Sequence, residues 1–300
     1  MDISLLAFAA ALVAAICQTA TDIGTKASTR GCDDATSLLA QWGLSAVLVT
    51  AACVFVHPGL LGAPATTLAA LTKPGFWPLL FWDSAINIVA YLFYFRAFRL
   101  ADASLVAPLV LLTPLLMLLT SPLMLGETVP PAGAIGVVFT VVGVGLLDAG
   151  EKPGRRLNFV NFLRNPGARA MLATAALWSI GANIDRMGVL ASTPLLWITG
   201  VTDAIALFAL CYRLSRPHRP AGLQALRPAF IAGAAMSVGN TAQMWALTIL
   251  FAPYVIAIKR LSALFTVLAG GRVLKEDVGG RLPGAALMLA GAIIIALARG

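Results

Sequence analysis

Apolar segments of about 20 residues, the length that crosses a bilayer as an α-helix, recur along the whole chain. The stretches between them are rich in proline, glycine and charge, as in "HPGLLGAPA", "GETVPP", "EKPGRRLNFVNFLRNPG" and "RLSRPHRPAGLQALRP". The pattern predicts ten spans, at residues 3–28, 35–56, 75–98, 103–123, 131–149, 168–190, 193–213, 228–250, 253–272 and 282–299. Because backbone polar groups inside a bilayer need internal partners, we expect an all-α integral membrane protein with ten transmembrane helices.

Composition adds to this picture by excluding a soluble domain. Of the 300 residues, 59% are hydrophobic and 11% are charged, whereas a soluble domain carries about 25% charged residues. The net charge of +8 is what basic cytoplasmic loops of a membrane protein produce, so it implies no nucleic-acid partner. The N-terminal stretch "MDISLLAFAAALVAAIC" lacks a positive n-region and is longer than the apolar core of a signal peptide, so we expect a retained first span.

The sequence contains no motif of catalysis or metal binding. The histidines, His57 and His218, lie in connecting stretches, and no HExxH, GxSxG or P-loop pattern occurs. The cysteines stand singly, without a CxxC pair, at Cys17, Cys32, Cys53 and Cys211. We therefore expect no enzyme, no cofactor, no metal, no disulfide and no direct use of ATP.

The two halves of the chain look like copies. "AAICQTATDI" (14–23) aligns with "AALWSIGANI" (175–184) at a shift of 161, and "LGETV" (125–129) aligns with "LKEDV" (274–278) at a shift of 149. Gly136 and Gly143 match Gly284 and Gly291, each pair on one helix face, although a shared preference for small residues would also produce such matches. We predict a first repeat at 1–150, a basic inter-repeat loop at 151–167 and a second repeat at 168–300. Because five spans per repeat is an odd number, the repeats should be inverted, which is a design of transporters with a central site.

Two long segments then carry a family resemblance. "ADASLVAPLVLLTPLLMLLTSPLMLGETVPPAGAIGVVFTVVGVGLL" and "YVIAIKRLSALFTVLAGGRVLKEDVGGRLPGAALMLAGAIIIAL" resemble the EamA-type drug/metabolite transporter superfamily. The resemblance implies a transporter fold of inverted repeats. It leaves the substrate open among amino acids, drugs, nucleotide sugars, sugar phosphates and lipid-linked groups. The adjacent Lys259 and Arg260 in span nine are also similar to the Lys-Arg pair with which plastid sugar-phosphate translocators hold phosphate.

Polar residues form stripes along spans one and three. Their members recur at helical spacing, and the matching positions of the second half are polar too. The stripes comprise Gln18, Asp22 and Lys26, then Asp83, Asn87, Tyr91 and Tyr94, with Ser179 and Asn183 matching Gln18 and Asp22, and Asn240 and Gln243 matching Tyr91 and Tyr94. Since polar groups facing lipid are costly, we expect these faces to line a shared hydrated cavity. Hydrogen bonds that join helices are the alternative role.

Lys259 and Arg260 stand side by side inside span nine, where each charge costs at least about 2.5 kcal/mol at the bilayer centre. Lys259 follows Pro253 by six residues, roughly 9 Å of helix, so snorkelling toward the interface is one explanation. Adjacent residues point about 100° apart, however, and the nearby "LFAP" offers no acidic partner. We therefore expect the pair to hold an anion, because the arginine fork suits phosphate or carboxylate and lysine adds a mobile charge.

The acidic residues of the spans have two predicted roles. Asp22 or Asp83 could neutralise the cations when the site is empty, and both are candidates for proton coupling, with Asp83 the better placed inside its span. The roles of Asp185, Arg186 and Asp203 stay open at this point.

Three functions follow from these features. The first is a secondary transporter that moves a small anionic solute, bearing phosphate or carboxylate, by alternating access. The second is a translocator of a lipid-linked phosphate head group, and the third is a proton-coupled exporter of amino acids or drugs. An uncoupled channel fits the inverted repeats less well. The expected partners are the solute or lipid-linked phosphate and the membrane lipids, with monomer or homodimer left open.

The charge of the loops predicts an orientation in the cell membrane. Outside the membrane-depth cations, 14 basic residues fall in the odd-numbered loops, and only Lys73 and Arg299 fall on the opposite side. The positive-inside rule then places the odd-numbered loops in the cytoplasm and both termini outside. Relatives in the superfamily are usually drawn with cytoplasmic termini, so the two lines of reasoning disagree.

Overall fold

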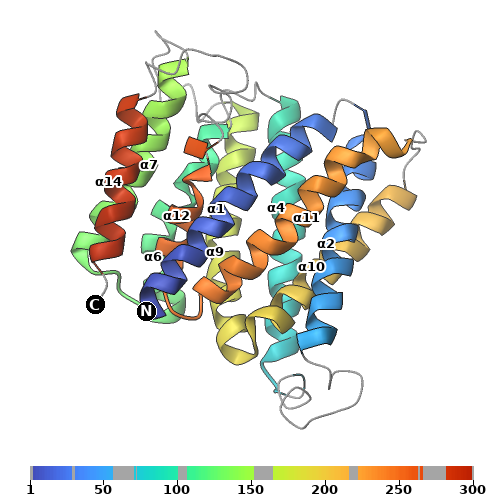
Figure 1. Cartoon of the computed structure of the whole chain (residues 1–300), viewed down its shortest axis with the longest axis horizontal. Coiled ribbons are helices and arrows are strands. Elements are labelled where there is room, and N and C mark those ends of the chain that lie inside the picture. Colours follow the sequence, from blue (N-terminus) through green and yellow to red (C-terminus); the bar gives the residue numbers. More distant parts are fainter. Residues whose placement is uncertain are drawn as a thin grey trace. The chain divides into compact units, whose positions relative to one another are not determined.

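The protein is described by a computed structural model, which covers residues 3–28, 31–56, 71, 73–100, 107–151, 165–215, 222–262, 264–265 and 282–298. These residues form helices and their connections, with no strand among them (Figure 1). The helices are α1 (Ile3–Ser28), α2 (Asp34–Val56), α4 (Phe76–Leu100), the 3₁₀-helix η2 (Ala107–Leu112), α6 (Thr113–Leu125), α7 (Pro131–Glu151), α9 (Pro166–Ala191), α10 (Pro194–Leu214), α11 (Leu223–Ala246), α12 (Ala252–Lys259) and α14 (Leu282–Leu297). The all-α fold expected from the sequence is confirmed.

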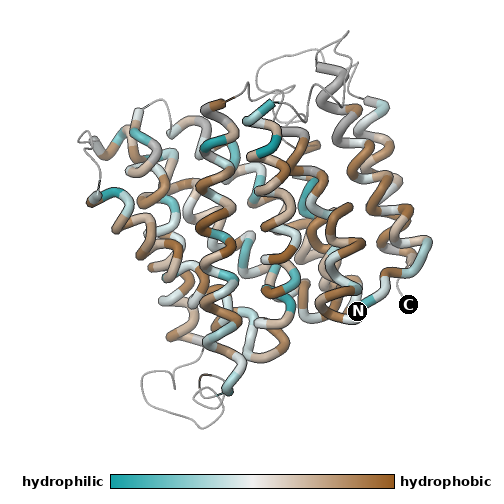
Figure 2. Tube along the Cα trace, turned by 180° about the vertical axis from the view of Figure 1, so that it is seen from behind, coloured by the Kyte–Doolittle hydropathy of each residue, from teal (hydrophilic) through white to brown (hydrophobic). Residues whose placement is uncertain are grey.

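The helices carry large apolar side chains on their exposed surfaces. Leu123 is 86% exposed, Phe55 83% and Leu119 67%, and Figure 2 shows brown, hydrophobic segments on the helices, with white and teal segments between them. Among the described residues, four segments are long and apolar enough to cross a membrane, at Ile3–Thr25, Ala35–Phe55, Phe76–Tyr94 and Pro194–Leu214. Exposed apolar surface of this kind belongs in lipid, so the chain is a multi-pass membrane protein.

The chain divides into two compact units, and each unit takes residues from both halves of the sequence. The first unit consists of Met1–Leu12, Ile86–Asn183 and Ile249–Gly300, and the second unit consists of Val13–Ala85 and Ile184–Thr248. The first unit therefore holds α6, α7, α12 and α14, and the second holds α2, α10 and α11. These units are defined by which residues lie close together in space. The predicted boundaries at 150 and 168 instead divide the sequence into repeats, and they stay predictions.

In the first unit α7 packs against α14 through glycines on both helices (Figure 1). A Cβ atom on Gly136 would lie 2.9 Å from the Gly291 carbonyl oxygen, and one on Gly143 would lie 2.8 Å from the Gly284 carbonyl oxygen. In the sequence alignment Gly136 corresponds to Gly284 and Gly143 to Gly291. In the structure the pairing is exchanged, because Gly136 lies against Gly291 and Gly143 against Gly284. Any antiparallel pair of helices with glycines seven residues apart would pair in this way, so the repeat interpretation of these two helices stays a prediction.

Polar side chains mark the start of α2 in the second unit. The Asp33 carboxylate accepts the Thr36 backbone N–H at 2.9 Å and the Thr36 hydroxyl at 2.8 Å, and the Arg213 guanidinium donates to that hydroxyl oxygen at 3.0 Å. Partial burial would raise the pKa of Asp33, but these hydrogen bonds and the charge of Arg213 together hold the pKa below its usual value of 3.8. Asp33 is thus an ionised N-cap that stabilises the helix start.

Spans four and nine differ from the prediction of continuous α-helices. In the described part of span four, the 3₁₀-helix η2 is followed at Thr113 by the α-helix α6. The cause is Pro114, which has no N–H for the Val110 carbonyl; the Thr113 hydroxyl donates to that carbonyl instead, at 2.6 Å. In span nine, the helix α12 ends at Lys259, and the predicted residues 266–272 lie outside the described part of the chain.

Candidate site at the broken helix of span nine

The cation pair lies where the α-helical hydrogen bonding of span nine tightens. The Arg260 N–H lies 3.2 Å from the Ile256 carbonyl and 3.1 Å from the Ala257 carbonyl, and the Leu261 N–H reaches Ile258, only three residues back, at 2.9 Å. No proline or glycine between 254 and 265 accounts for this change. A stretch of 3₁₀ bonding inside a span leaves carbonyl groups and helix ends available at membrane depth, as in the discontinuous helices of transporters.

The length of α12 places its end inside the membrane. Eight residues of α-helix are about 12 Å long, less than half of the roughly 30 Å hydrocarbon core. Lys259 occupies the last turn of α12 and Arg260 caps it. Arg260 and Leu261 form a turn that separates α12 from the helical residues that begin at Ser262.

Packing fixes α12 within the first unit. Every residue from Ala252 to Ile258 is buried, and α12 contacts α6 and α7. Tyr254, 1% exposed, packs edge to face on Phe251 with ring centroids 5.5 Å apart. Its ring lies directly over Gly133 of α7, where any Cβ atom would overlap the phenol. The end of α12, which carries Lys259 and Arg260, is therefore held by a tightly packed segment, while both cations are themselves only half-buried.

The two interrupted spans correspond in the repeat alignment and contact each other. At the shift of 149, Lys259 and Arg260 align with Val110 and Leu111 of η2, and α6 packs against α12. The aligned segments differ in form, since η2 is a 3₁₀-helix and α12 is an α-helix that ends at Lys259, and only the second half carries charge at these positions.

Two predicted tyrosines form an aromatic group in the first unit. Trp178 of α9 packs against Tyr91 at 5.6 Å between ring centroids, with an interplanar angle of 74°, and against Tyr94 at 5.5 Å and 41°. Asn87, one turn before Tyr91, is half-buried. Trp178 was not among the predicted site residues, although it lies one position before Ser179 in the matching stripe of the second half.

Asn183 has a bonding pattern that joins helices. Its amide group donates to the Thr120 hydroxyl at 2.8 Å and to the Ser179 carbonyl at 2.9 Å, and its oxygen accepts the Ser121 hydroxyl at 2.7 Å. The side chain is fully buried. These bonds between α9 and α6 favour the helix-joining alternative for Asn183 over substrate binding.

The remaining predicted site residues belong to the second unit. Gln18 donates to the Asp22 carboxylate at 2.7 Å, and Asp22 is exposed. Asp83 is fully buried, Gln243 is 6% exposed, and Asn240 is half-buried. The side chain of Lys26 lies outside the described part. The shared cavity that would bring all eleven predicted residues together stays a prediction.

The structure accounts for two charged residues whose role the sequence left open. The Asp185 carboxylate accepts the Trp197 indole N–H at 2.8 Å, which joins α9 to α10. Arg186 donates to the Leu247 carbonyl at the end of α11. Both side chains are 8% exposed, so they hold helix ends together within the second unit.

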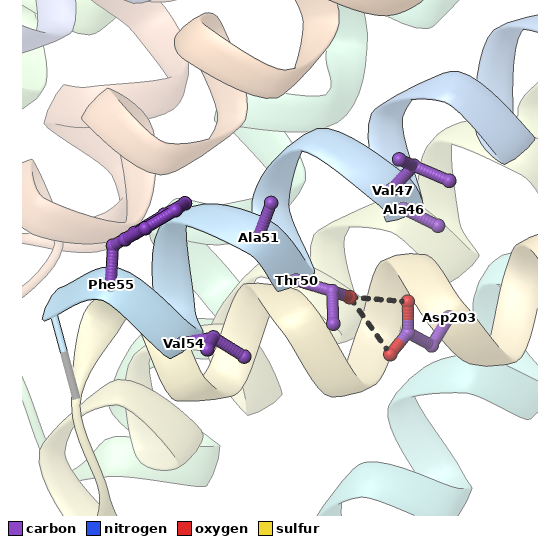
Figure 3. A pocket seen from close by; sticks show the side chains of 7 residues that line it. All are labelled: Ala46, Val47, Thr50, Ala51, Val54, Phe55 and Asp203. Atoms are coloured by element: carbon purple, nitrogen blue, oxygen red, sulfur yellow. Dashed lines mark hydrogen bonds between the residues drawn. The ribbon is translucent and has the colours of Figure 1, made fainter. Parts of the chain in front are cut away.

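A groove on the second unit contains a carboxylate that the sequence left unexplained (Figure 3). Asp203 lies midway along α10, and both of its oxygens face the Thr50 hydroxyl of α2, at 3.0 and 3.2 Å. The groove has a volume of about 570 Å³, and apart from this pair only alanine, valine and phenylalanine side chains line it. No signal in the sequence pairs these two residues, because 153 positions separate them.

Residues 5–147 match the model of the EamA-like transporter family. A protein of known crystal structure shares the fold with a TM-score of 0.75 and 20% sequence identity, over 98% of this chain and 97% of the other. No curated protein matches the sequence.

Proposed function

Residues 5–147 match the EamA-like transporter family, and on that premise we propose that the chain is a secondary transporter of a small anionic solute. The chain is a membrane transporter of the drug/metabolite type, and the proposal concerns what it carries. The observation behind the proposal is that α12 ends at Lys259 and Arg260 within span nine. In the repeat alignment this span corresponds to span four, which contains the 3₁₀-helix η2. Broken helices in matching positions of inverted repeats are typical of substrate sites in transporters.

The chemistry of the pair sets the substrate class. A guanidinium group binds phosphate or carboxylate with two parallel hydrogen bonds, and an ammonium group adds a compact charge that can follow the ligand. Lys259 and Arg260 supply both, and the positions that match them in the first half, Val110 and Leu111, supply neither. A solute with one or two negative charges fits this asymmetric site better than a cationic drug does.

We assign proton coupling, where it operates, to Asp83 in preference to Asp22. Asp83 is fully buried, whereas Asp22 is exposed and accepts a hydrogen bond from Gln18. The burial of Asp83 inside its span is the observation behind this choice. The lipid-linked phosphate translocator uses the same cation pair and differs only in needing a ligand with a hydrocarbon tail.

The test is a ligand panel on the purified full-length protein, read as the shift of its thermal unfolding. The probes are a sugar phosphate, a nucleotide sugar, a dicarboxylate and a polyprenyl phosphate, each beside its uncharged parent compound. A ligand at 100 times its dissociation constant stabilises the native state by about 2.7 kcal/mol. We expect one anionic class to stabilise the wild type, and its uncharged parent to have no effect.

Two double variants decide whether the pair is the binding site. Lys259→Gln/Arg260→Gln should lose the response, while Lys73→Gln/Arg227→Gln, which removes the same charge at exposed positions, should keep it. Equal stabilisation of both variants by the anion would place the site elsewhere. A response that requires the polyprenyl tail would favour the lipid-linked substrate over the free solute.

We further propose that the chain lies in the cell membrane with its odd-numbered loops in the cytoplasm and both termini outside. The start of α4 exposes Trp77, Phe81 and Trp82, which is typical of a membrane interface. The other end of α4 carries the exposed Arg96. A C-terminal fusion to alkaline phosphatase should be active in cells, and a C-terminal fluorescent fusion that requires cytoplasmic folding should be dark; the opposite pair of results reverses the orientation.

A further inference from the structure

A second cluster of cations, separate from the pair on α12, lies at one end of the first unit. A pocket of about 300 Å³ is lined by residues from the end of α4 and the start of α9, namely Phe93, Arg96, Leu100, Pro166, Arg169 and Ala170. Both arginines are exposed, and no carboxylate is among the lining residues. Among the described residues that line this pocket, two guanidinium groups and no carboxylate occur; like charges so placed repel each other and favour a bound anion.

The position of Arg96 along α4 places the pocket at the level of the lipid head groups. The 21 residues from Phe76 to Arg96 make about 30 Å of helix, which matches the hydrocarbon thickness of a bilayer. The apolar stretch of α4 ends at Tyr94, two residues before Arg96. Arg169 lies in the first turn of α9, which begins at Pro166. Both charges therefore lie at the end of their spans.

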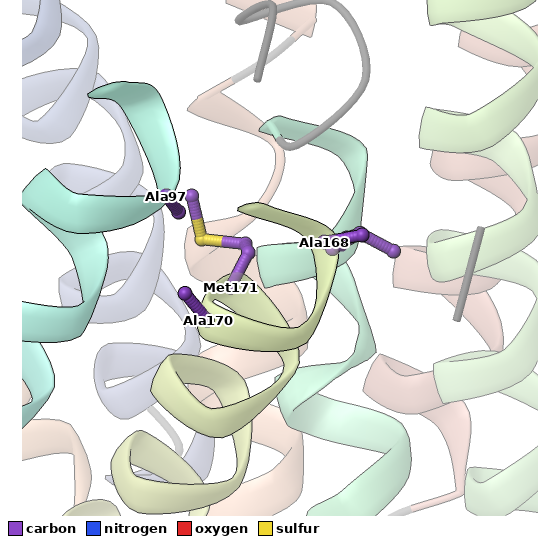
Figure 4. Packing of buried hydrophobic residues seen from close by; sticks show 5 residues of the cluster. Ala97, Ala168, Ala170 and Met171 are labelled. Carbon is purple, nitrogen blue, oxygen red and sulfur yellow. The ribbon is translucent and has the colours of Figure 1, made fainter. Parts of the chain in front are cut away.

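A packed apolar cluster lies beside the pocket (Figure 4). Ala97, Ala168, Ala170 and Met171 are each at most 6% exposed and join the end of α4 to the start of α9. The pocket residue Phe93 packs against this cluster, and Ala170 belongs to both. The two helices that carry Arg96 and Arg169 are thus held together at this pocket by apolar packing.

An apolar path leads from the pocket down the exposed face of α4. Val89 is 41% exposed, and Leu92 and Leu100 are each 44% exposed. Leu92, Arg96 and Leu100 follow Val89 by three, seven and eleven residues, so all four lie on one face of the helix. A ligand held at Arg96 can therefore lay a hydrocarbon chain on this face. A free phosphate ion has no hydrocarbon chain that could bind to such a surface.

The start of α9 adds a favourable field without supplying the binding groups. The Asn165 side-chain oxygen accepts the backbone N–H groups of Gly167 at 2.8 Å and Ala168 at 3.2 Å, so those two amides are already bonded. The positive end of the helix dipole still points toward the pocket that Pro166 lines. Anion binding there thus falls to the two arginine side chains.

We propose that this pocket binds the phosphate group of an anionic phospholipid, in the leaflet that faces the basic loops. Arg96 and Arg169 hold the phosphate, and an acyl chain lies along Val89 and Leu92. Basic pockets between spans on the cytoplasmic side recognise lipid phosphates in this way. The inference concerns an annular lipid and does not depend on which solute the transporter carries.

The experiment compares lipids that share acyl chains and differ in charge. Phosphatidylglycerol, phosphatidylcholine and inorganic phosphate are added to the delipidated full-length protein, and bound lipid is counted by native mass spectrometry beside the thermal shift. We expect phosphatidylglycerol to bind the wild type about tenfold or more tightly than phosphatidylcholine, because each basic side chain near the surface attracts an anionic lipid. Equal binding of the two lipids overturns the proposal, and so does equal stabilisation by inorganic phosphate, which would mean a site for free anions.

Variants locate the binding. Arg96→Gln/Arg169→Gln should lose the preference for phosphatidylglycerol, Arg96→Lys/Arg169→Lys should keep most of it, and Arg227→Gln, at an exposed arginine outside the pocket, should leave it unchanged. If the glutamine variant misfolds, the lysine variant and the lipid comparison on the wild type still decide. An unchanged preference in the folded glutamine variant contradicts the assignment to this pocket.

Discussion

The crossing of α7 and α14 allows a sharp prediction, because Gly291→Ala adds a single methyl group against backbone. The new Cβ atom would lie 2.6 Å from both the Gly136 carbonyl oxygen and the Thr140 nitrogen, and 2.5 Å from the Thr140 hydroxyl. Backbone atoms in two packed helices cannot rotate away, so α7 and α14 must separate. Overpacking of this kind costs about 1–3 kcal/mol, against a gain of about 1 kcal/mol in helix propensity.

Gly43→Ala is the matched control, since it makes the same change in the interior of α2. There the nearest neighbour of the new methyl group is the Leu39 side chain at 3.8 Å, an ordinary contact. Both variants gain helix propensity, so the difference between their unfolding free energies isolates the overpacking, about 1–3 kcal/mol. Thermal unfolding in one detergent measures that difference. Equal midpoints for the two variants would refute the close approach of α7 and α14.

Three further changes test the remaining polar contacts. Trp197→Phe should destabilise the protein by about 1–3 kcal/mol, because Asp185 loses a buried donor; the same change at the exposed Trp82 should have little effect on the midpoint. Asp33→Asn should destabilise most at neutral pH. Because the pKa of Asp33 is lowered from 3.8, its ionised carboxylate stabilises the fold above pH 3.8, and this stabilisation is lost as the pH falls below that value. A difference in unfolding midpoint between wild type and variant that grows in acid would contradict the role of Asp33 as a cap. Asp203→Asn should raise the midpoint in lipid nanodiscs, because a carboxylate exposed at mid-span costs at least about 2.5 kcal/mol; a lower midpoint would show that the charge is needed.

The sequence was sufficient for the helices themselves. Hydropathy alone placed the first span at 3–28, and α1 runs from Ile3 to Ser28; the spans around α7 and α10 agree similarly well. This success reflects the length of apolar helix that a bilayer demands. Irregular helices are harder to predict. Pro114 was a signal in span four that the prediction of a continuous helix did not use, whereas nothing in "IAIKRLSALF" indicates the end of α12 at Lys259.

The polar residues show what sequence cannot supply. Spacing identified the stripe of Tyr91 and Tyr94, yet their contact with Trp178 depends on how α4 and α9 are rotated about their axes. The same holds for Asp203, whose partner Thr50 lies on another helix. A helical pattern tells which residues share a face, but the neighbour of that face is set by tertiary packing.

The most direct test of the central claim is counterflow in proteoliposomes. Vesicles that contain the wild type, Lys259→Gln/Arg260→Gln or Lys73→Gln/Arg227→Gln are loaded with an unlabelled sugar phosphate or dicarboxylate, and the uptake of its radiolabelled form is followed. We predict uptake by the wild type and by the exposed-charge control, and loss of uptake in the variant without the pair. Transport of a neutral amino acid or a lipophilic cation in place of every anion, or unchanged anion uptake without Lys259 and Arg260, would contradict the account.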